Sequence, residues 1–438
     1  MSGLLMFVLP LAATNILQLL FNAADVVIVG RFAGDLCLAA VSSTNHLVHL
    51  FTNLFTGMSV GVNVLIAHKI GEGSKNGISK AIHTSLLFGL MCGSFLTVFG
   101  LILTRTALVA INTPDNVLEL AVLYLRIYFL SMPALIVYNF GAAVLRAKGD
   151  TKRPMYYLTL SGILNVILNV ILVVVFRMTV DGVAIATVIS EYISAVLVLR
   201  LLVLEEEEFR LDISKLKIDG DSLRNILYLG VPAGLQSTMF SISNVVIQSS
   251  INIFGSTMMS GCGAASSVES FANGIVQALA TGTMTFVSQN AGAGKPDRIM
   301  KTIGYSILIG AVFCSSFLLM AVFFDRQLIA IYAPNPAVID CGIIRLHYAL
   351  GSYMLYTLLQ LAASVLRGLK YSLIPTIAMM AGVCGIRLIW IAAVFSRFQT
   401  IENVMITYPL SWGITSAVLW AVTIIIFRKQ HLQPEKGK

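Results

Sequence analysis

Residues 4–30 form a nearly unbroken apolar run that contains one carboxylate, Asp25. About 20 apolar residues in a helix suffice to cross the hydrocarbon core of a bilayer, so the run is predicted to span a membrane. Read as a helix, it places three more polar residues on the face of the acid; they are Asn15, Gln18 and Asn22. Since charge inside a membrane costs at least about 2.5–3.5 kcal/mol, this stripe is a candidate functional site. Alternatively, Asp25 lies among the lipid headgroups, because a helix places it about 30 Å from the start of the run.

Eleven further apolar runs follow, each bounded by charged residues, glycine or proline. Charged residues make up only 11% of the 438 residues, whereas soluble globular proteins carry about 25%. The sequence therefore predicts an all-α integral membrane protein with twelve transmembrane helices. The expected spans are 4–30, 45–68, 81–104, 118–145, 154–176, 182–203, 225–253, 263–290, 301–324, 340–366, 373–396 and 404–427.

The basic residues are distributed unevenly between the loops on the two sides of the membrane. One set of loops carries 21 lysines and arginines and the opposite set carries five. Because cytoplasmic loops are enriched in these residues, both termini are predicted to be cytoplasmic, in a multi-pass protein of the plasma membrane. The net charge of +8 is thus attributed to topology, and no nucleic-acid partner is expected.

An internal repeat divides the chain into halves. Residues 144–146 match residues 365–367, and the same offset of 221 relates Gly61 to Gly282. Six spans in each half give the halves the same orientation, as two six-helix lobes related by a parallel pseudo-two-fold axis. The predicted domains are an N-lobe at 1–203, a cytoplasmic linker at 204–224 and a C-lobe at 225–438. The acidic run 205–208 is interpreted as a solvated part of this linker.

No pattern of an enzyme is found. Residues 290–295 resemble a phosphate-binding loop, but the pattern requires glycine where the chain has Gln289 and serine or threonine where it has Pro296. The six histidines and six cysteines show no metal-binding spacing. We therefore expect no catalytic residues and no cofactor, and we interpret the chain as a carrier driven by an ion gradient.

Two amides on the fifth span are candidates for ion coupling. Asn165 and Asn169 share a helical face, and Thr187 lies on the sixth span. Together with Asp25 they would form an oxygen-rich pocket suited to a hard cation such as Na⁺ or to a carboxylate that takes up H⁺. Ordinary hydrogen bonding between helices is the alternative interpretation of the asparagines.

The second half lacks a counterpart of Asp25 and carries its acid on the eighth span, at Glu269. Arg387, on the eleventh span, is interpreted as the only base in the middle of the membrane. The two residues are predicted either to pair with each other or to bind substrate. This asymmetry suggests that one lobe handles the coupling ion and the other contributes more to substrate binding.

Several segments together resemble the multidrug and toxic compound extrusion (MATE) transporters. They are Pro10 with Asp25 in the first span and residues 38–42, 144–154, 182–187, 286–295 and 366–368. The resemblance implies a two-lobed, V-shaped bundle that alternates between outward and inward openings. It implies a cation site at Asp25, Asn165, Asn169 and Thr187 and a hinge at Pro10. Many members have aspartate where this chain has Asn169, so the choice between H⁺ and Na⁺ stays open.

We therefore expect a secondary active antiporter that works as a monomer. It would export small organic, cationic or amphiphilic compounds in exchange for H⁺ or Na⁺. Two alternatives are a flippase for a lipid-linked precursor and a membrane receptor or assembly subunit that transports nothing.

Overall fold

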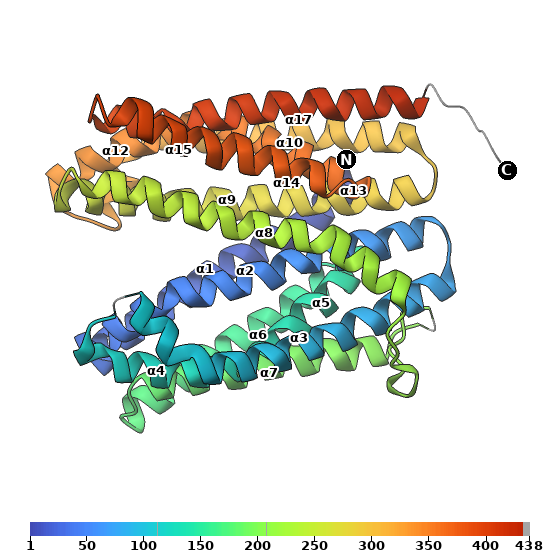
Figure 1. Cartoon of the computed structure of the whole chain (residues 1–438), viewed down its shortest axis with the longest axis horizontal. Helices are drawn as coiled ribbons and strands as arrows, with labels where there is room; N and C mark the ends of the chain where they lie inside the picture. The colour runs from blue at the N-terminus through green and yellow to red at the C-terminus, as the bar shows by residue number, and fades with distance from the viewer. Residues whose placement is uncertain (112, 207, 432–438) are drawn as a thin grey trace. The chain divides into compact units, whose positions relative to one another are not determined.

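The computed structural model describes residues 1–111, 113–206 and 208–431, and this part of the chain is helical without any strand (Figure 1). The prediction of an all-α protein is confirmed. The elements are α1 (Ser2–Ile28), η1 (Val29–Ala33), α2 (Asp35–Gly71), α3 (Lys75–Ala110), α4 (Asp115–Phe129), α5 (Met132–Lys148), α6 (Lys152–Asn169), η2 (Val170–Val175), α7 (Val180–Val203), η3 (Ile213–Lys215), α8 (Gly220–Asn252), α9 (Ser256–Gly292), α10 (Pro296–Phe323), α11 (Asp325–Ala330), α12 (Pro336–Gly351), α13 (Tyr353–Gly368), α14 (Leu373–Met379), η4 (Met380–Gly385), α15 (Ile386–Trp390), η5 (Ile391–Phe395), α16 (Ile401–Met405) and α17 (Thr407–His431).

The helices agree with the predicted apolar runs, although their lengths and composition do not establish twelve spans. Over the described residues, eight helical segments are long and apolar enough to cross a membrane, or up to ten if each of two bent pairs is one span. The predicted spans 225–253 and 263–290 coincide with α8 and α9, which are long but rich in serine, glycine and other small or polar residues. The count of twelve therefore stays a prediction.

Two predicted spans are bent. Between α4 and α5 the chain turns by 45°, and Pro133 lies in the first turn of α5. Proline lacks the backbone N–H and clashes with the preceding turn, which ends the helix before it. Between α12 and α13 the bend is 44°. Here the Ser352 hydroxyl donates hydrogen bonds to the carbonyl oxygens of Tyr348 and Ala349.

The chain forms two compact units, residues 9–234 (the N-terminal unit) and residues 1–8 with 235–438 (the C-terminal unit). α1 and α8 are therefore each divided between units. In the N-terminal unit, α8 lies so close to α2 that a Cβ atom on Gly234 would be 2.4 Å from the carbonyl oxygen of Leu54. In the C-terminal unit, the Phe7 ring meets the Phe286 ring edge-on, with centroids 5.5 Å apart. These contacts explain why the limits of the units differ from the predicted division at 204–224.

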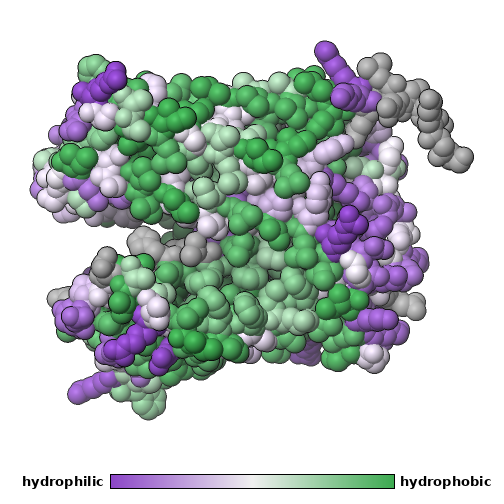
Figure 2. Space-filling view, in the orientation of Figure 1, coloured by the Kyte–Doolittle hydropathy of each residue, from purple (hydrophilic) through white to green (hydrophobic). Residues whose placement is uncertain are grey.

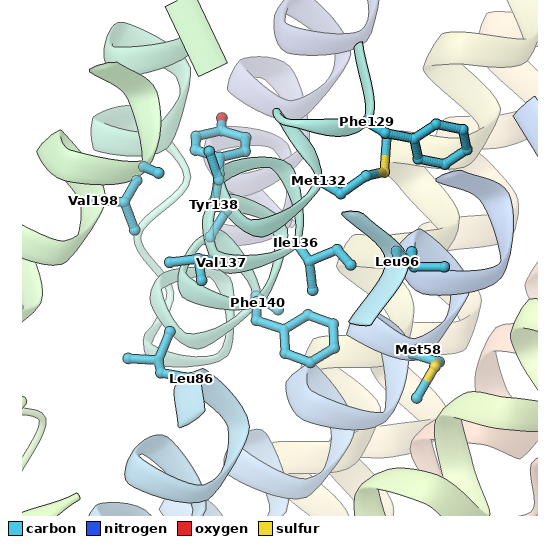
Figure 3. Packing of buried hydrophobic residues seen from close by; sticks show 14 of the residues in the cluster. Met58, Leu86, Leu96, Phe129, Met132, Ile136, Val137, Tyr138, Phe140 and Val198 are labelled. Carbon is cyan, nitrogen blue, oxygen red and sulfur yellow. The ribbon is translucent and has the colours of Figure 1, made fainter. Parts of the chain in front are cut away.

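The core of the N-terminal unit surrounds α5, which packs against α2, α3 and α7. Figure 3 shows Phe140 and Ile136 of α5 beside Leu96 of α3 and Met58 of α2. Lipid tails are as apolar as these side chains, so packing and the close approach of small residues stabilise such contacts in a membrane. On the face seen in Figure 2, apolar residues cover the sides of the helices and hydrophilic residues gather at their ends.

The segment after α7 is attached to the N-terminal unit by ion pairs. The Glu205 side chain is only 5% exposed, with Oε2 2.6 Å from Lys148 Nζ and Oε1 2.5 Å from Arg153 Nη2. Glu208 pairs with Lys75. The prediction that the acidic run 205–208 is simply solvated is thus wrong for Glu205, because two basic residues surround it; residue 207 lies outside the described residues.

Candidate ion-coupling site

α1, α6 and α7 bring the predicted ion-site residues together inside the N-terminal unit. Asp25 is half-buried one turn before the π-helical segment η1, and Asn165 and Asn169 are buried on α6. Because α6 is a regular helix at these positions, the spacing of four aligns the two amides on one face. α6 also packs along α7, which carries Thr187.

A chain of hydrogen bonds joins these residues. Asn169 Nδ2 donates to Asp25 Oδ1 at 2.7 Å and to Asn165 Oδ1 at 3.1 Å. Asn165 Nδ2 in turn donates to Ser190 Oγ at 3.3 Å. The Ser190 hydroxyl donates to the backbone carbonyl of Thr187 at 2.9 Å. The hydrogen bonds therefore link the acid on α1, through the two amides of α6, to Ser190 on α7.

One oxygen of this chain is left without a partner. Asn169 Oδ1 is buried and accepts no hydrogen bond from any group that the structure describes. Both hydrogens of the same amide are already used, by Asp25 and Asn165. A buried acceptor without a donor is unfavourable and rare in folded proteins. The arrangement therefore suits a species that supplies positive charge or a hydrogen-bond donor beside the carboxylate.

Thr187 contributes less directly than predicted. Its hydroxyl donates to the Val183 carbonyl of its own helix at 3.0 Å, and it joins the network through its backbone carbonyl. Ser190 instead supplies the hydroxyl that meets Asn165. A sequence signal for Ser190 exists, since it follows Thr187 by three residues and thus lies on the same face of α7.

The remaining first-span candidates lie outside this network. The side chains of Gln18 and Asn22 are exposed in the N-terminal unit, and their roles stay predictions. Pro10 lies within α1, where the Thr14 hydroxyl donates to its carbonyl oxygen at 2.8 Å. The hinge at Pro10 also stays a prediction.

In the C-terminal unit the predicted pair of Glu269 with Arg387 is wrong. Arg345 takes the place of Arg387, with Nε 2.8 Å from Oε1 of Glu269 and Nη2 3.1 Å from Oε2. Arg345 lies on α12 and Arg387 on α15, and both side chains are buried. Arg387 is thus not the only buried base of the C-terminal unit, and its position in the middle of the membrane stays a prediction.

The all-helical fold, the helices long and apolar enough to cross a membrane and the buried acid–amide network are features typical of multi-pass membrane transporters. The MatE family model matches residues 10–171 and 232–391, once in each predicted half, so the chain belongs to the MatE family. The resemblance to multidrug and toxic compound extrusion transporters is confirmed.

One relative and one solved structure match nearly the whole chain, and a second relative matches about three quarters of it. The "Probable multidrug resistance protein YoeA" of Bacillus subtilis (strain 168) is 27% identical over 98% of this chain and 94% of its own length. The "FAD transporter" of Shewanella oneidensis is 26% identical over 73% of this chain and 72% of its own length. A solved structure described as an outward-facing multidrug resistance MATE family transporter superposes with a TM-score of 0.89 at 20% identity, covering 98% of this chain and 96% of its own.

Proposed function

We propose that this chain is a secondary active antiporter that exports small organic compounds in exchange for H⁺ or Na⁺. The observation that supports this most is the unpaired Asn169 Oδ1 beside the Asp25 carboxylate. A protonated Asp25 would donate a hydrogen bond, and Na⁺ would coordinate the carboxylate and amide oxygens as a hard cation does. Either ion neutralises a charge that is costly within a membrane.

The transport cycle follows from the need to neutralise Asp25. In the outward-open carrier Asp25 takes up the ion, α1 rearranges around Pro10, and the substrate is released outside. In the inward-open carrier the ion leaves and a new substrate binds. Proline within a helix removes one backbone hydrogen bond, which makes α1 easier to bend there.

The membrane orientation and the working unit belong to the same proposal. The excess of lysine and arginine in one set of loops favours cytoplasmic termini in the plasma membrane. The polar network around Asp25 comes from one unit of one chain, which favours a carrier that works as a monomer. The resemblance favours cationic or amphiphilic substrates, whereas the relatives are called multidrug resistance proteins and, in one case, an FAD transporter.

Flux into or out of proteoliposomes tests this function. Wild-type protein is reconstituted into liposomes, and two transport substrates are tried, the aromatic cation ethidium and the aromatic anion 2-naphthoate. Flux is followed under a pH gradient and separately under a Na⁺ gradient. Asp25→Asn keeps the shape of the side chain and removes its charge. Glu119→Gln is the matched control, because Glu119 forms an exposed ion pair with Arg105. We expect flux under one gradient, lost in Asp25→Asn and retained in Glu119→Gln.

Two results would contradict the proposal. Asp25→Asn flux equal to that of the wild type would remove Asp25 from coupling. If no gradient drives either compound, the flippase or a non-transporting receptor or assembly subunit becomes the better explanation.

A further inference from the structure

The C-terminal unit buries a guanidinium group that no carboxylate neutralises. Arg387 is only 3% exposed. Its Nε donates to Ser411 Oγ and its Nη1 to Asn244 Oδ1, both at 3.3 Å, and both acceptors are neutral. In the described part of the chain no acid lies within ion-pairing distance of Arg387, whereas Arg345 has Glu269. A buried charge normally requires an opposite charge nearby.

The neighbouring charges increase this imbalance. The guanidinium carbons of Arg387 and Arg345 lie 4.6 Å and 5.7 Å from the centroid of the same Tyr408 ring. Among the described residues, Glu269 is the one carboxylate paired with either arginine, and it already binds Arg345 with both oxygens. The cluster therefore carries one excess positive charge.

Aromatic rings surround this charge. Trp412 is the centre of the group, with ring centroids 5.0 Å from Tyr356, 5.3 Å from Tyr408 and 6.0 Å from Tyr353. The Arg387 guanidinium carbon is 5.8 Å from the Trp412 ring. Tyr353, Tyr408 and Trp412 are buried and Tyr356 is half-buried, so another aromatic group would reach this cluster from the side of Tyr356, whose ring adjoins Trp412.

Polar amides connect the cluster to the surface of the C-terminal unit. The Tyr356 hydroxyl donates to Asn273 Oδ1 at 3.0 Å and accepts from Gln277 Nε2 at 3.2 Å. Asn273, Gln277 and Asn244, which meets Arg387, all have exposed side chains. In an apolar helical protein, amides at this position suit a polar compound better than a lipid tail.

We propose that the cluster around Arg387 and Trp412 is a binding site for aromatic anions. The acidic group, a carboxylate, sulfonate or phosphate, would pair with the guanidinium, and the ring would lie against Trp412 and Tyr356. Arginine has five N–H donors, of which Asn244 and Ser411 take two, so Nη2 remains for a forked contact with an anion.

This inference rests on the proposed export function in one respect: it names the substrate class of the exporter. It departs from the expectation of cationic substrates, because a second positive charge beside Arg387 would be repelled. Glu269 cannot compensate, since Arg345 occupies both of its carboxylate oxygens.

Binding to the purified full chain tests the site without any ion gradient. Three probes share one ring system and differ in charge: 2-naphthoate, 2-naphthamide and trimethyl-2-naphthylammonium. Titration calorimetry in chloride-free buffer should give the tightest binding for naphthoate, about tenfold tighter than for the amide. Chloride, added as a competitor, should displace naphthoate only weakly because it cannot stack on the rings.

Variants assign the binding to named residues. Arg387→Gln should weaken naphthoate binding about tenfold or more, and Arg387→Lys should weaken it less because it keeps the charge. Trp412→Leu should weaken naphthoate and naphthamide alike. Arg397→Gln is the matched control, since Arg397 is exposed after η5. If Arg387→Gln does not fold, the proposal is tested by the affinity of Arg387→Lys for naphthoate and by the order of affinities of the wild type for the three probes.

The outcomes separate this inference from the proposed function. Equal or tighter binding of the cation, or unchanged binding in Arg387→Gln, would overturn the anion site. Chloride binding as tightly as naphthoate would overturn the aromatic class. Naphthoate binding that depends on Arg387, with no gradient-driven flux of any probe, would support the site and contradict the antiporter. Gradient-driven ethidium flux without naphthoate binding would support the antiporter and contradict the anion site.

Discussion

At the scale of single residues, the partner of each buried polar side chain decides what the candidate sites contain. The spacing of Asn165 and Asn169 predicts that they share a face, and the structure brings both to Asp25. The partner of Glu269 could not be predicted in the same way. Arg345 and Arg387 both lie on predicted spans, and only the rotation and contacts of the helices decide which arginine reaches the acid.

Ser190→Ala tests whether the amide chain supports coupling. The substitution removes the acceptor of Asn165 Nδ2, so a buried donor loses its partner and stability should fall by about 1 kcal/mol. Gradient-driven flux should fall without being abolished, because Asp25 remains. The measurements are the thermal unfolding midpoint in detergent and flux in proteoliposomes.

Ser194→Ala is the matched control for Ser190→Ala. Ser194 is buried on the same helix, and within the described part of the chain its hydroxyl donates to the carbonyl of Glu191 and accepts from no amide. Ser190 makes the equivalent bond to Thr187 but also accepts from Asn165. Equal losses of flux in the two variants would show that the bond to Asn165 has no part in coupling.

At the scale of elements, apolar run length predicts the helices well, because about 20 apolar residues have few alternatives to a helix in a membrane. The bends are harder to predict. Pro133 gives a signal for the break before α5, but the break at Ser352 has no proline. There the side-chain hydroxyl caps the preceding turn through its bonds to Tyr348 and Ala349, a contact that the sequence pattern does not reveal.

Gly93→Ala tests the close approach of α3 to the bend. A Cβ atom on Gly93 would lie 2.4 Å from the Cα atom of Pro133, and this backbone cannot move without shifting α5. We expect a loss of about 1–3 kcal/mol in the free energy of unfolding, measured as a lower unfolding midpoint.

The control is Gly304→Ala on α10, where nothing lies within 4 Å of the added atom. That variant should be neutral or slightly more stable, since alanine favours helix over glycine. Equal midpoints for the two variants would contradict tight packing at the bend.

At the scale of the whole molecule, the connection between the predicted halves is itself part of the N-terminal unit. Its composition alone suggests a solvated linker, because a run of glutamates is usually exposed. The structure instead holds Glu205 between Lys148 of α5 and Arg153 of α6. His83 of α3 accepts a hydrogen bond from the backbone N–H of Asp212 at 3.1 Å. The compact units thus correspond largely to the halves of the sequence repeat, and their limits differ at the start of α1 and within α8.

Glu205→Gln, measured across pH, tests how far this attachment stabilises the protein. Burial raises the pKa of Glu205, but Lys148 and Arg153 outweigh it and hold the pKa below its ordinary range. A carboxyl whose pKa is lowered in the folded protein stabilises it fully above the unfolded pKa, about 4.3 for glutamate. The wild type should therefore unfold at a higher temperature than Glu205→Gln at pH 7. The difference should shrink as the pH falls below about 4.3 and vanish below the folded pKa.

Glu206→Gln provides the control for this pH series. Glu206 is 83% exposed and lies 3.8 Å from Lys148, so removing its charge should leave the unfolding midpoint unchanged at every pH. A difference between the wild type and Glu205→Gln that stayed constant down to pH 3 would mean that the carboxylate charge is not what stabilises the segment. A difference that disappears with protonation of Glu205 would show that the ion pairs with α5 and α6 attach the connection between the halves to the N-terminal unit.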